Sequence, residues 1–116
     1  MYMSKLGGTP GPGSPQGPAR KARHVMVTVT LRSTVIKQCP YRHEIDTGEL
    51  VIVLDGDAPE LHGLAAQIDA LCAEPISHEH FTARVAAILP IGARVTTNWT
   101  TGPWAVQVEA TGAVPR

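Results

Sequence analysis

The residues best suited to chemistry gather in one short stretch of the chain, residues 38–46. This stretch holds the thiol of Cys39, the imidazole of His43 and two carboxylates, one of which is Asp46. Basic neighbours such as Arg42 and His43 are the surroundings expected of a reactive cysteine, and the thiolate is the form that attacks carbon electrophiles. If the chain folds back on itself, Asp46 can donate or accept the proton. The stretch therefore indicates nucleophilic catalysis, although a small buried cysteine ahead of a turn proline would have the same local sequence.

A second cluster, Ser77-His78-Glu79-His80, lies where a helix is expected to begin. Free N–H groups and the positive end of the dipole make such a position suitable for holding anions or orienting a ligand. Glu79 is also a good first-turn residue for the same electrostatic reason, and a capping role alone would explain it. The cluster adds an acid, a base and a ligand-binding position to the candidate site.

Cys39, His43, His78 and His80 together have the ligand types of a zinc site. The chain has neither a C-x-x-C nor an H-E-x-x-H motif, so no spacing is diagnostic of a metal, and we assign no metal ligands. No glycine-rich phosphate loop follows a strand pattern, which argues against a nucleotide site of that kind. A zinc enzyme stays open as an alternative.

Hydrophobic periodicity predicts the elements that must position these residues. Alternation predicts a strand from Val25 into residues 35–36, with Val25, Val27, Val29 and Leu31 on its apolar face. Residues 38–47 are expected to be irregular, and residues 49–54 form a second strand.

The period then changes to that of a helix. A first helix is expected from Pro59 to Cys72, and a second from the cap residue Ser77 to about Leu89. Residues 94–99 and 104–109 alternate again and form a hairpin around Thr100-Thr101-Gly102-Pro103.

The order ββααββ predicts an α+β fold in which two helices cover one face of a four-stranded antiparallel sheet. Its edge strands would be long and exposed. Natural proteins rarely leave such edges open, so we expect subunits to pair edge to edge into a closed ring.

Composition divides the 116 residues into three parts. Residues 1–24 are rich in glycine and proline and hold Lys5, Arg20, Lys21 and Arg23 without an acid, which predicts a disordered basic leader. Residues 25–112 form the catalytic domain, and residues 113–116 form a tail. All ten acidic residues lie beyond residue 24, so the domain is mildly acidic and a nucleic-acid-binding face is not expected on it.

Targeting and redox signals are few. No apolar run is long enough to span a bilayer, and no apolar segment follows Lys5 as it would in a secretory signal. The two cysteines, Cys39 and Cys72, are expected to be free thiols. These features predict a cytoplasmic protein without a membrane partner.

Cys39-Pro40, Asp46 seven residues after the cysteine, and His78-Glu79 at the start of a helix resemble the motifs of one family. The chain is similar to the 7-cyano-7-deazaguanine (nitrile) reductases of the queuosine pathway, known as QueF, and to their short amidine-forming QueF-like relatives. The resemblance spans about residues 25–110. It implies the tunnelling fold, in which ββααββ subunits assemble into barrels with active sites at subunit interfaces.

The resemblance also implies roles for single residues. Cys39 would attack the nitrile carbon to give a covalent thioimide, and Asp46 would protonate the nitrile nitrogen. Glu79 would bind the N–H groups of the deazaguanine, and His78 would carry or orient a proton beside it. Glu60 would match the glutamate that begins a further segment in the reductases, and we place it with Glu79 among the substrate-binding residues.

That further segment departs from the family pattern. In the reductases it is rich in lysine and serine and is associated with NADPH, whereas the residues after Glu60, from 61 to 67, contain no lysine. Where the reductases have an Arg-Asn pair, this chain reads Ala73-Glu74-Pro75. NADPH is therefore a possible cofactor whose usual motif is absent, and amidine formation by ammonia is slightly favoured over reduction.

Three function classes follow. The first is an enzyme that converts 7-cyano-7-deazaguanine, as the free base or within a nucleic acid, through a Cys39 thioimide. The second is a zinc-dependent tunnelling-fold enzyme acting on a pterin or GTP. The third is a purine-binding module that retains Glu79 but does not catalyse a reaction.

Overall fold

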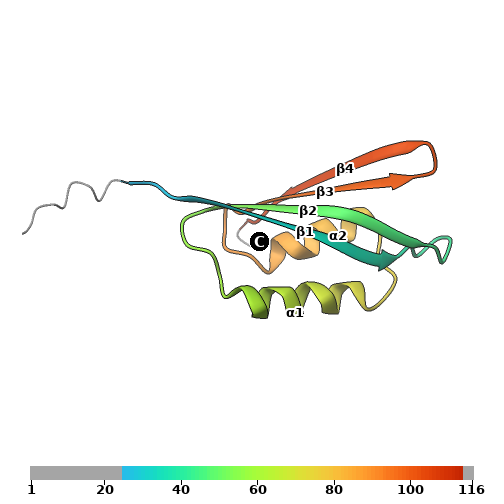
Figure 1. Ribbon diagram of the computed structural model, residues 1–116, viewed down its shortest axis with the longest axis horizontal. Helices are drawn as coiled ribbons and strands as arrows, with labels where there is room; N and C mark the ends of the chain where they lie inside the picture. The colour runs from blue at the N-terminus through green and yellow to red at the C-terminus, as the bar shows by residue number, and fades with distance from the viewer. Residues whose placement is uncertain (1–24, 114–116) are drawn as a thin grey trace, which may run out of the picture.

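The fold was analysed in a computed structural model that describes residues 25–113 (Figure 1). The elements are β1 (Thr28–Gln38), β2 (Ile45–Asp55), α1 (Leu61–Cys72), α2 (His78–Ala87), β3 (Arg94–Thr101) and β4 (Trp104–Thr111). The predicted ββααββ order is confirmed. The leader predicted for residues 1–24, and residues 114–116 of the predicted tail, lie outside the described residues.

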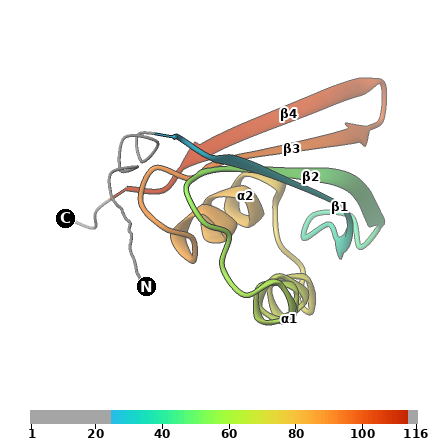
Figure 2. The same cartoon turned by 60° about the vertical axis from the view of Figure 1, so that its left-hand side comes forward.

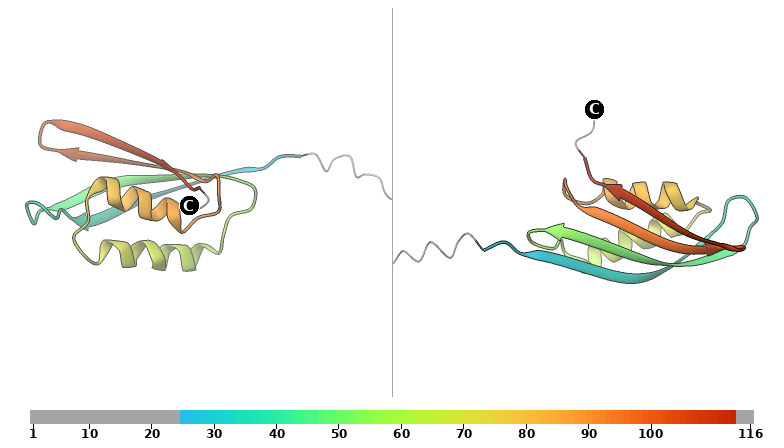
Figure 3. Two further views of the ribbon diagram at one scale, coloured as in Figure 1. Left: turned by 180° about the vertical axis from the view of Figure 1, so that it is seen from behind. Right: turned by 90° about the horizontal axis from the view of Figure 1, so that it is seen from above.

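The four strands form one antiparallel sheet in the order β1-β2-β3-β4. Both helices lie on the same face of this sheet, as the two turned views in Figure 2 and Figure 3 show. α2 packs against β3 and β4, whereas α1 lies nearer to β1 and beside α2. The α+β architecture with two helices on one face is as predicted.

Alternation along the strands explains which face the helices cover. Leu50, Ile52 and Leu54 of β2 are buried, and the register places Ile52 between Leu31 of β1 and Val95 of β3. The helices contribute their apolar stripes to the same core. Its buried members are Val35, Leu50, Ile52, Leu54, Leu64, Ile68, Phe81, Val85, Ala86, Leu89, Ala93, Val95 and Trp99.

Side chains cap the start of both helices. The Ser77 hydroxyl accepts a hydrogen bond from the backbone N–H of His80 at 3.1 Å, which confirms Ser77 as the cap of α2. The cap of α1 is Glu60, whose carboxylate accepts from the N–H groups of His62 and Gly63 at 2.9 and 2.7 Å. The first helix therefore starts at Leu61, two residues later than predicted.

The first hairpin is longer and displaced relative to the prediction. Val25 and Val27 lie before β1 and are 72% and 53% exposed, since the ladder with β2 ends at Asp55 opposite Thr28. The expectation that residues 38–47 are irregular holds for residues 39–44, which connect the strands, and is wrong for Gln38 and for residues 45–47, which are in β1 and β2. Backbone pairing extends a regular ladder through polar residues that carry no hydrophobic signal.

The sheet has two edges within the described part of the chain. β1 and β4 occupy them, with 11 and 8 residues respectively, so the predicted long edge strands are present.

Neither of the two helices is long and apolar enough to span a membrane.

Candidate active site

The candidate residues converge at one end of the sheet, where β1 ends and β2 and α2 begin. Cys39 directly follows β1, Asp46 is the second residue of β2, and His78 is the first residue of α2. A hydrogen bond of 3.1 Å from the backbone N–H of Ile76 to the carbonyl of Gln38 ties the loop before α2 to the end of β1. The fold thus brings together residues that lie about 40 positions apart in the sequence.

The turn after β1 holds Cys39 in a defined place. The Cys39 N–H donates to the carbonyl of Glu44 at 2.7 Å, and the His43 N–H donates to the carbonyl of Cys39 at 3.2 Å. His43 closes the turn with a φ of 57°, a left-handed conformation that non-glycine residues seldom adopt. Cys39 is a free, half-buried thiol, as the sequence predicted.

Asp46 forms a buried ion pair with a residue that the sequence analysis missed. The register sets Lys37 directly opposite Asp46, and the Lys37 Nζ donates to the Asp46 Oδ2 at 3.0 Å. The side chains are 0% and 11% exposed. The alternation of side chains along the predicted strand could have identified Lys37. It lies two positions after Val35 and therefore falls on the same apolar face.

The same register relates Asp46 to the candidate nucleophile. Cys39 comes two positions after Lys37, and its N–H already bonds the residue opposite to it on the β2 side. The backbone of Cys39 therefore lies two residue pairs beyond the Lys37–Asp46 pair, at the same end of the sheet.

His78 is held by contacts on three sides. Its ring stacks on Trp99 with 4.5 Å between ring centroids and an interplanar angle of 9°. Its Nε2 lies 3.0 Å from the Thr101 Oγ1, and its Nδ1 lies 4.0 Å from the Asp46 Oδ2. The Nδ1 is buried and has no hydrogen-bond partner among the described residues. The ring therefore turns one free nitrogen toward the carboxylate.

The electrostatics of the cluster favour a neutral imidazole at His78. Burial lowers the pKa of His78 first, and the Lys37 ammonium lowers it further, while Asp46 and Glu79 act in the opposite direction. A neutral ring with an unpartnered nitrogen can accept a proton or a hydrogen bond. His78 is thus suited to proton transfer near Asp46.

Trp99 connects the cluster to the core. The Lys37 Nζ lies 4.7 Å from the centroid of one Trp99 ring, and the indole N–H donates to the Thr97 Oγ1 at 2.8 Å. The Thr97 hydroxyl lies 2.6 Å from that of Thr82, which donates to the carbonyl of His78 at 2.8 Å. The Trp99 ring and the start of α2 are therefore held by one hydrogen-bonded network.

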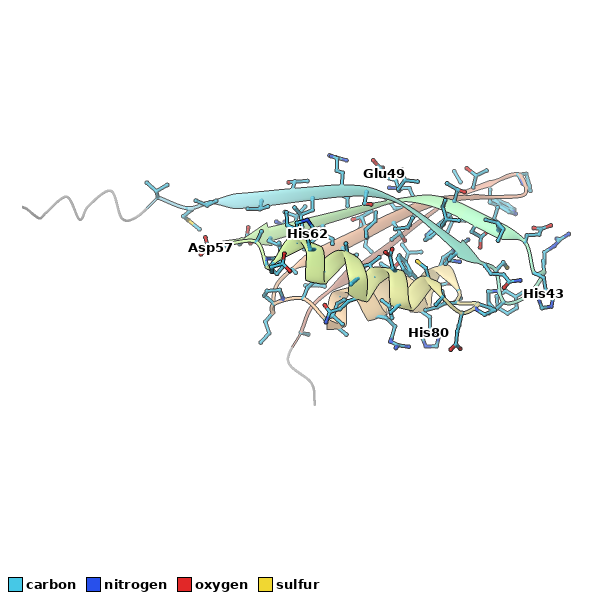
Figure 4. The ribbon with its side chains drawn as sticks, turned by 60° about the horizontal axis from the view of Figure 1, so that its bottom comes forward. His43, Glu49, Asp57, His62 and His80 are labelled. Atoms are coloured by element: carbon cyan, nitrogen blue, oxygen red, sulfur yellow. The ribbon has the colours of Figure 1, made fainter. Side chains whose placement is uncertain are left out.

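The two predicted substrate-binding glutamates lie far apart in this protomer. Glu79 is exposed next to His78, and its carboxylate makes no hydrogen bond or ion pair among residues 25–113. Glu60 caps α1 and contacts His62, with 3.2 Å between the Glu60 Oε2 and the His62 Nδ1. Figure 4 shows His62 at the opposite end of the molecule from His43. The structure thus brings Cys39, Asp46, His78 and Glu79 together but not Glu60.

The surface has two main cavities. One of about 450 Å³ is lined by Pro40 and Tyr41 from the turn after β1 and by Ser77, His80 and Arg84 from α2. Its walls are polar, and Cys39, Asp46, His78 and Glu79 are not among its lining residues. The larger cavity, about 550 Å³, lies between β1, β2 and α1 and includes none of the candidate catalytic residues.

Cysteine and histidine, the residue types that bind zinc, occur at this end of the sheet. Within residues 25–113, no three histidine, cysteine, aspartate or glutamate side chains are grouped to hold a metal ion. Of the four zinc candidates, His43 and His80 are exposed and point outward near the turn and the start of α2 (Figure 4).

One solved structure shares this architecture. The crystal structure of the archaeosine synthase QueF-Like in the apo form matches with 23% sequence identity and a TM-score of 0.65, over 76% of this chain and 96% of that chain. No family model and no curated protein sequence matches this chain. At this identity the likeness is one of fold: this chain has the fold of the archaeosine synthase QueF-Like.

Proposed function

We propose that this chain is an enzyme of the QueF-like group that acts on the nitrile of 7-cyano-7-deazaguanine through a covalent thioimide on Cys39. The observation that carries the proposal is the half-buried free thiol of Cys39 in the turn directly after β1, at the end of the sheet where Asp46 lies with His78 beside its carboxylate. Support also comes from the shared fold, since the archaeosine synthase is 96% covered by the match.

The first step is addition of the thiol across the nitrile. The Cys39 S–H bond and one π bond of the C≡N group break, the sulfur forms a bond to the nitrile carbon, and the nitrogen gains one proton by way of Asp46. Nothing leaves the substrate, so the adduct carries its whole mass. A nitrile is a weak electrophile, and simultaneous protonation of its nitrogen is what lowers the barrier to attack.

The second step releases the product. Attack of ammonia on the thioimide carbon expels the Cys39 thiol and leaves an amidine, with no change in oxidation state. Reduction to an aminomethyl group would instead consume two NADPH and two protons. We favour ammonia because α1, from Leu61 to Cys72, offers no lysine or arginine to bind the phosphates of the cofactor.

Glu79 supplies the anchor for the base in this proposal. Its carboxylate is exposed, unoccupied within the described chain and adjacent to His78. A guanine-like edge presents neighbouring N–H donors, which a carboxylate can accept in pairs. The substrate is the free base or the same base within a nucleic acid, and the mildly acidic domain favours the free base.

The proposal includes a homo-oligomer. The long edge strands β1 and β4 present backbone donors and acceptors that a second copy can pair with. In a closed ring, Glu60 of one subunit can approach the active site of a neighbouring subunit, whereas it lies far from the active site of its own protomer. Light scattering of the purified protein measures the number of subunits, and a monomer at micromolar concentration would contradict this part.

Intact-protein mass spectrometry after incubation with 7-cyano-7-deazaguanine tests the chemistry. We expect a mass increase equal to one whole substrate molecule, lost in Cys39→Ala and retained in the matched control Cys72→Ala. The control removes a thiol that packs against the core. Ammonium and NADPH are then added separately, and ammonium is expected to discharge the adduct.

Other outcomes would redirect the assignment. An adduct that persists in Cys39→Ala would refute the nucleophile. Base binding that survives Cys39→Ser, without turnover under any added nucleophile, would favour a binding module. Stoichiometric zinc that is lost on mutating Cys39 would favour the metal-dependent pterin or GTP enzyme.

A further inference from the structure

Lys37 is the most deeply buried charged residue among residues 25–113, and it takes no part in the two reaction steps proposed above. Its side chain is 0% exposed, with the Nζ 3.0 Å from the Asp46 Oδ2 and 4.7 Å from the centroid of a Trp99 ring. It lies on the apolar face of β1, two positions after buried Val35. An aliphatic residue would suit this position as a matter of packing.

Stability alone does not account for such a pair. Removing two charges from water costs free energy that their attraction seldom recovers in full, and replacement of a buried pair by apolar residues is often neutral or stabilising. The pair also lies where chemistry is proposed, because Lys37 is two positions before Cys39 at the end of β1. Its location therefore points to a functional role.

We infer that Lys37 is a positioning residue that holds Asp46 as an oriented carboxylate before each catalytic cycle. This inference rests on the proposed function and changes the starting role of Asp46. A carboxylate paired with an ammonium is a proton acceptor, so Asp46 first takes the proton of the Cys39 thiol. The thiolate then attacks the nitrile carbon, and Asp46 returns the same proton to the nitrile nitrogen.

These steps need no proton from solvent. One S–H bond and one C–N π bond break, one S–C bond and one N–H bond form, and Asp46 and Lys37 end as they began. Lys37 stays protonated throughout and does not touch the substrate. Its contribution is to keep the carboxylate charged and to hold one oxygen, which leaves the other oxygen for the thiol and the nitrile.

The surroundings of Asp46 contain few other charges. From β1 it faces Lys37, and from α2 it faces His78, with 4.0 Å between the His78 Nδ1 and the Asp46 Oδ2; Glu79 is the next residue on that helix. The nearby residue from β3, Trp99, is uncharged. Without Lys37, the carboxylate would be left in a largely buried place with only the histidine to balance it.

The test compares wild-type protein with Lys37→Gln, Lys37→Arg and the packing control Val35→Ala between pH 5.5 and 9. Two rates are measured by quenched intact mass with all proteins in a Cys72→Ala background: adduct formation with 7-cyano-7-deazaguanine, and alkylation of Cys39 by iodoacetamide. Alkylation requires loss of the thiol proton but no nitrile. It therefore reports on Lys37 even if the wild-type protein forms no adduct, the outcome that would refute the proposed function.

Each rate is expected to fall on the acid side of its pH profile, and this fall is called the acidic limb. In Lys37→Gln we expect the acidic limb of both profiles to shift to higher pH by about one unit or more, and the rates to recover at alkaline pH. Lys37→Arg keeps the charge, and its limb should coincide with that of wild-type protein. Val35→Ala should leave the limb in place even where its overall rate is lower. A uniform loss across all pH values in Lys37→Gln, or no loss, would overturn the inference.

The Arg variant keeps the inference testable if Lys37→Gln does not fold. A shifted acidic limb in folded Lys37→Arg would show that the charge does not set the profile. Circular dichroism of each variant at pH 7.5 establishes which of them fold.

Discussion

Gly48 lies opposite Trp99 in the sheet, and its missing side chain makes room for the indole on which His78 stacks. A Cβ added at Gly48 would lie 2.5 and 2.7 Å from the Trp99 Cε3 and Cζ3 and 2.8 Å from the carbonyl oxygen of Asn98. One of these neighbours is backbone and cannot move without disturbing β3. We predict that Gly48→Ala displaces the Trp99 ring and, with it, His78 and Lys37.

The magnitude follows from the crowding. Overpacking a well-packed core typically costs about 1–3 kcal/mol, and three contacts at this distance place Gly48→Ala toward the upper end. A loss of about 2–3 kcal/mol in a domain of this size lowers the Tm by roughly 10–20 °C. Adduct formation on Cys39 is expected to slow as well, since the carboxylate and imidazole lose their common support.

Thermal unfolding at a fixed protein concentration measures the stability, because an assembling protein has a concentration-dependent Tm. Tryptophan fluorescence in a Trp104→Phe background then reports on Trp99 alone. Gly63→Ala on α1 is the matched control: its new Cβ meets only the end of the flexible Glu60 side chain, and alanine is favoured in a helix by about 0.5–1 kcal/mol. Wild-type stability and an unchanged Trp99 spectrum in Gly48→Ala would refute the reasoning.

Three further predictions concern single residues. Burial and the nearby Asp69 carboxylate raise the pKa of Cys72, so its alkylation by iodoacetamide should need a higher pH than that of an exposed cysteine; equal rates in a pH series would contradict this. The pKa of His78 is lowered in the folded state from its ordinary value of 6.5, so the unfolded chain binds the proton first as the pH falls. The contribution of His78 to stability is therefore complete above about pH 6.5 and is lost below it, and His78→Gln should flatten the acid side of a pH–stability curve from urea titrations. Thr82→Val removes the buried hydroxyl between Thr97 and the His78 carbonyl and should cost about 1–3 kcal/mol in the same titrations, with no effect refuting the network.

The order of elements could be predicted because each has a strong local signal. Alternation marked the strands, and the spacing of Leu64 and Ile68 marked a helix whose buried side they form. Ser77 was recognised as a cap from its type and position, and the structure confirms its hydrogen bond. These features depend on neighbours within a few residues, which a sequence pattern records directly.

The first hairpin was predicted less well, and the reason is physical. Residues 45–48 are in β2 because they pair with β1 through backbone hydrogen bonds, although Asp46 and Gly48 are of types that are depleted in strands. Asp46 was expected in a loop for this reason. The pairing that moves it onto a strand is also what places it opposite Lys37.

The sequence by itself determined the fold class, the two clusters of reactive residues and the long edges of the sheet. Only the tertiary structure decided that Lys37 and Trp99 join the site and that Glu60 caps α1 at the other end of the protomer. Motif spacing records which groups lie close along the chain, whereas a site depends on which groups are close in space. Strand register and the hydrogen bond from Ile76 to Gln38 set that proximity here, and both join residues that the local sequence leaves unrelated.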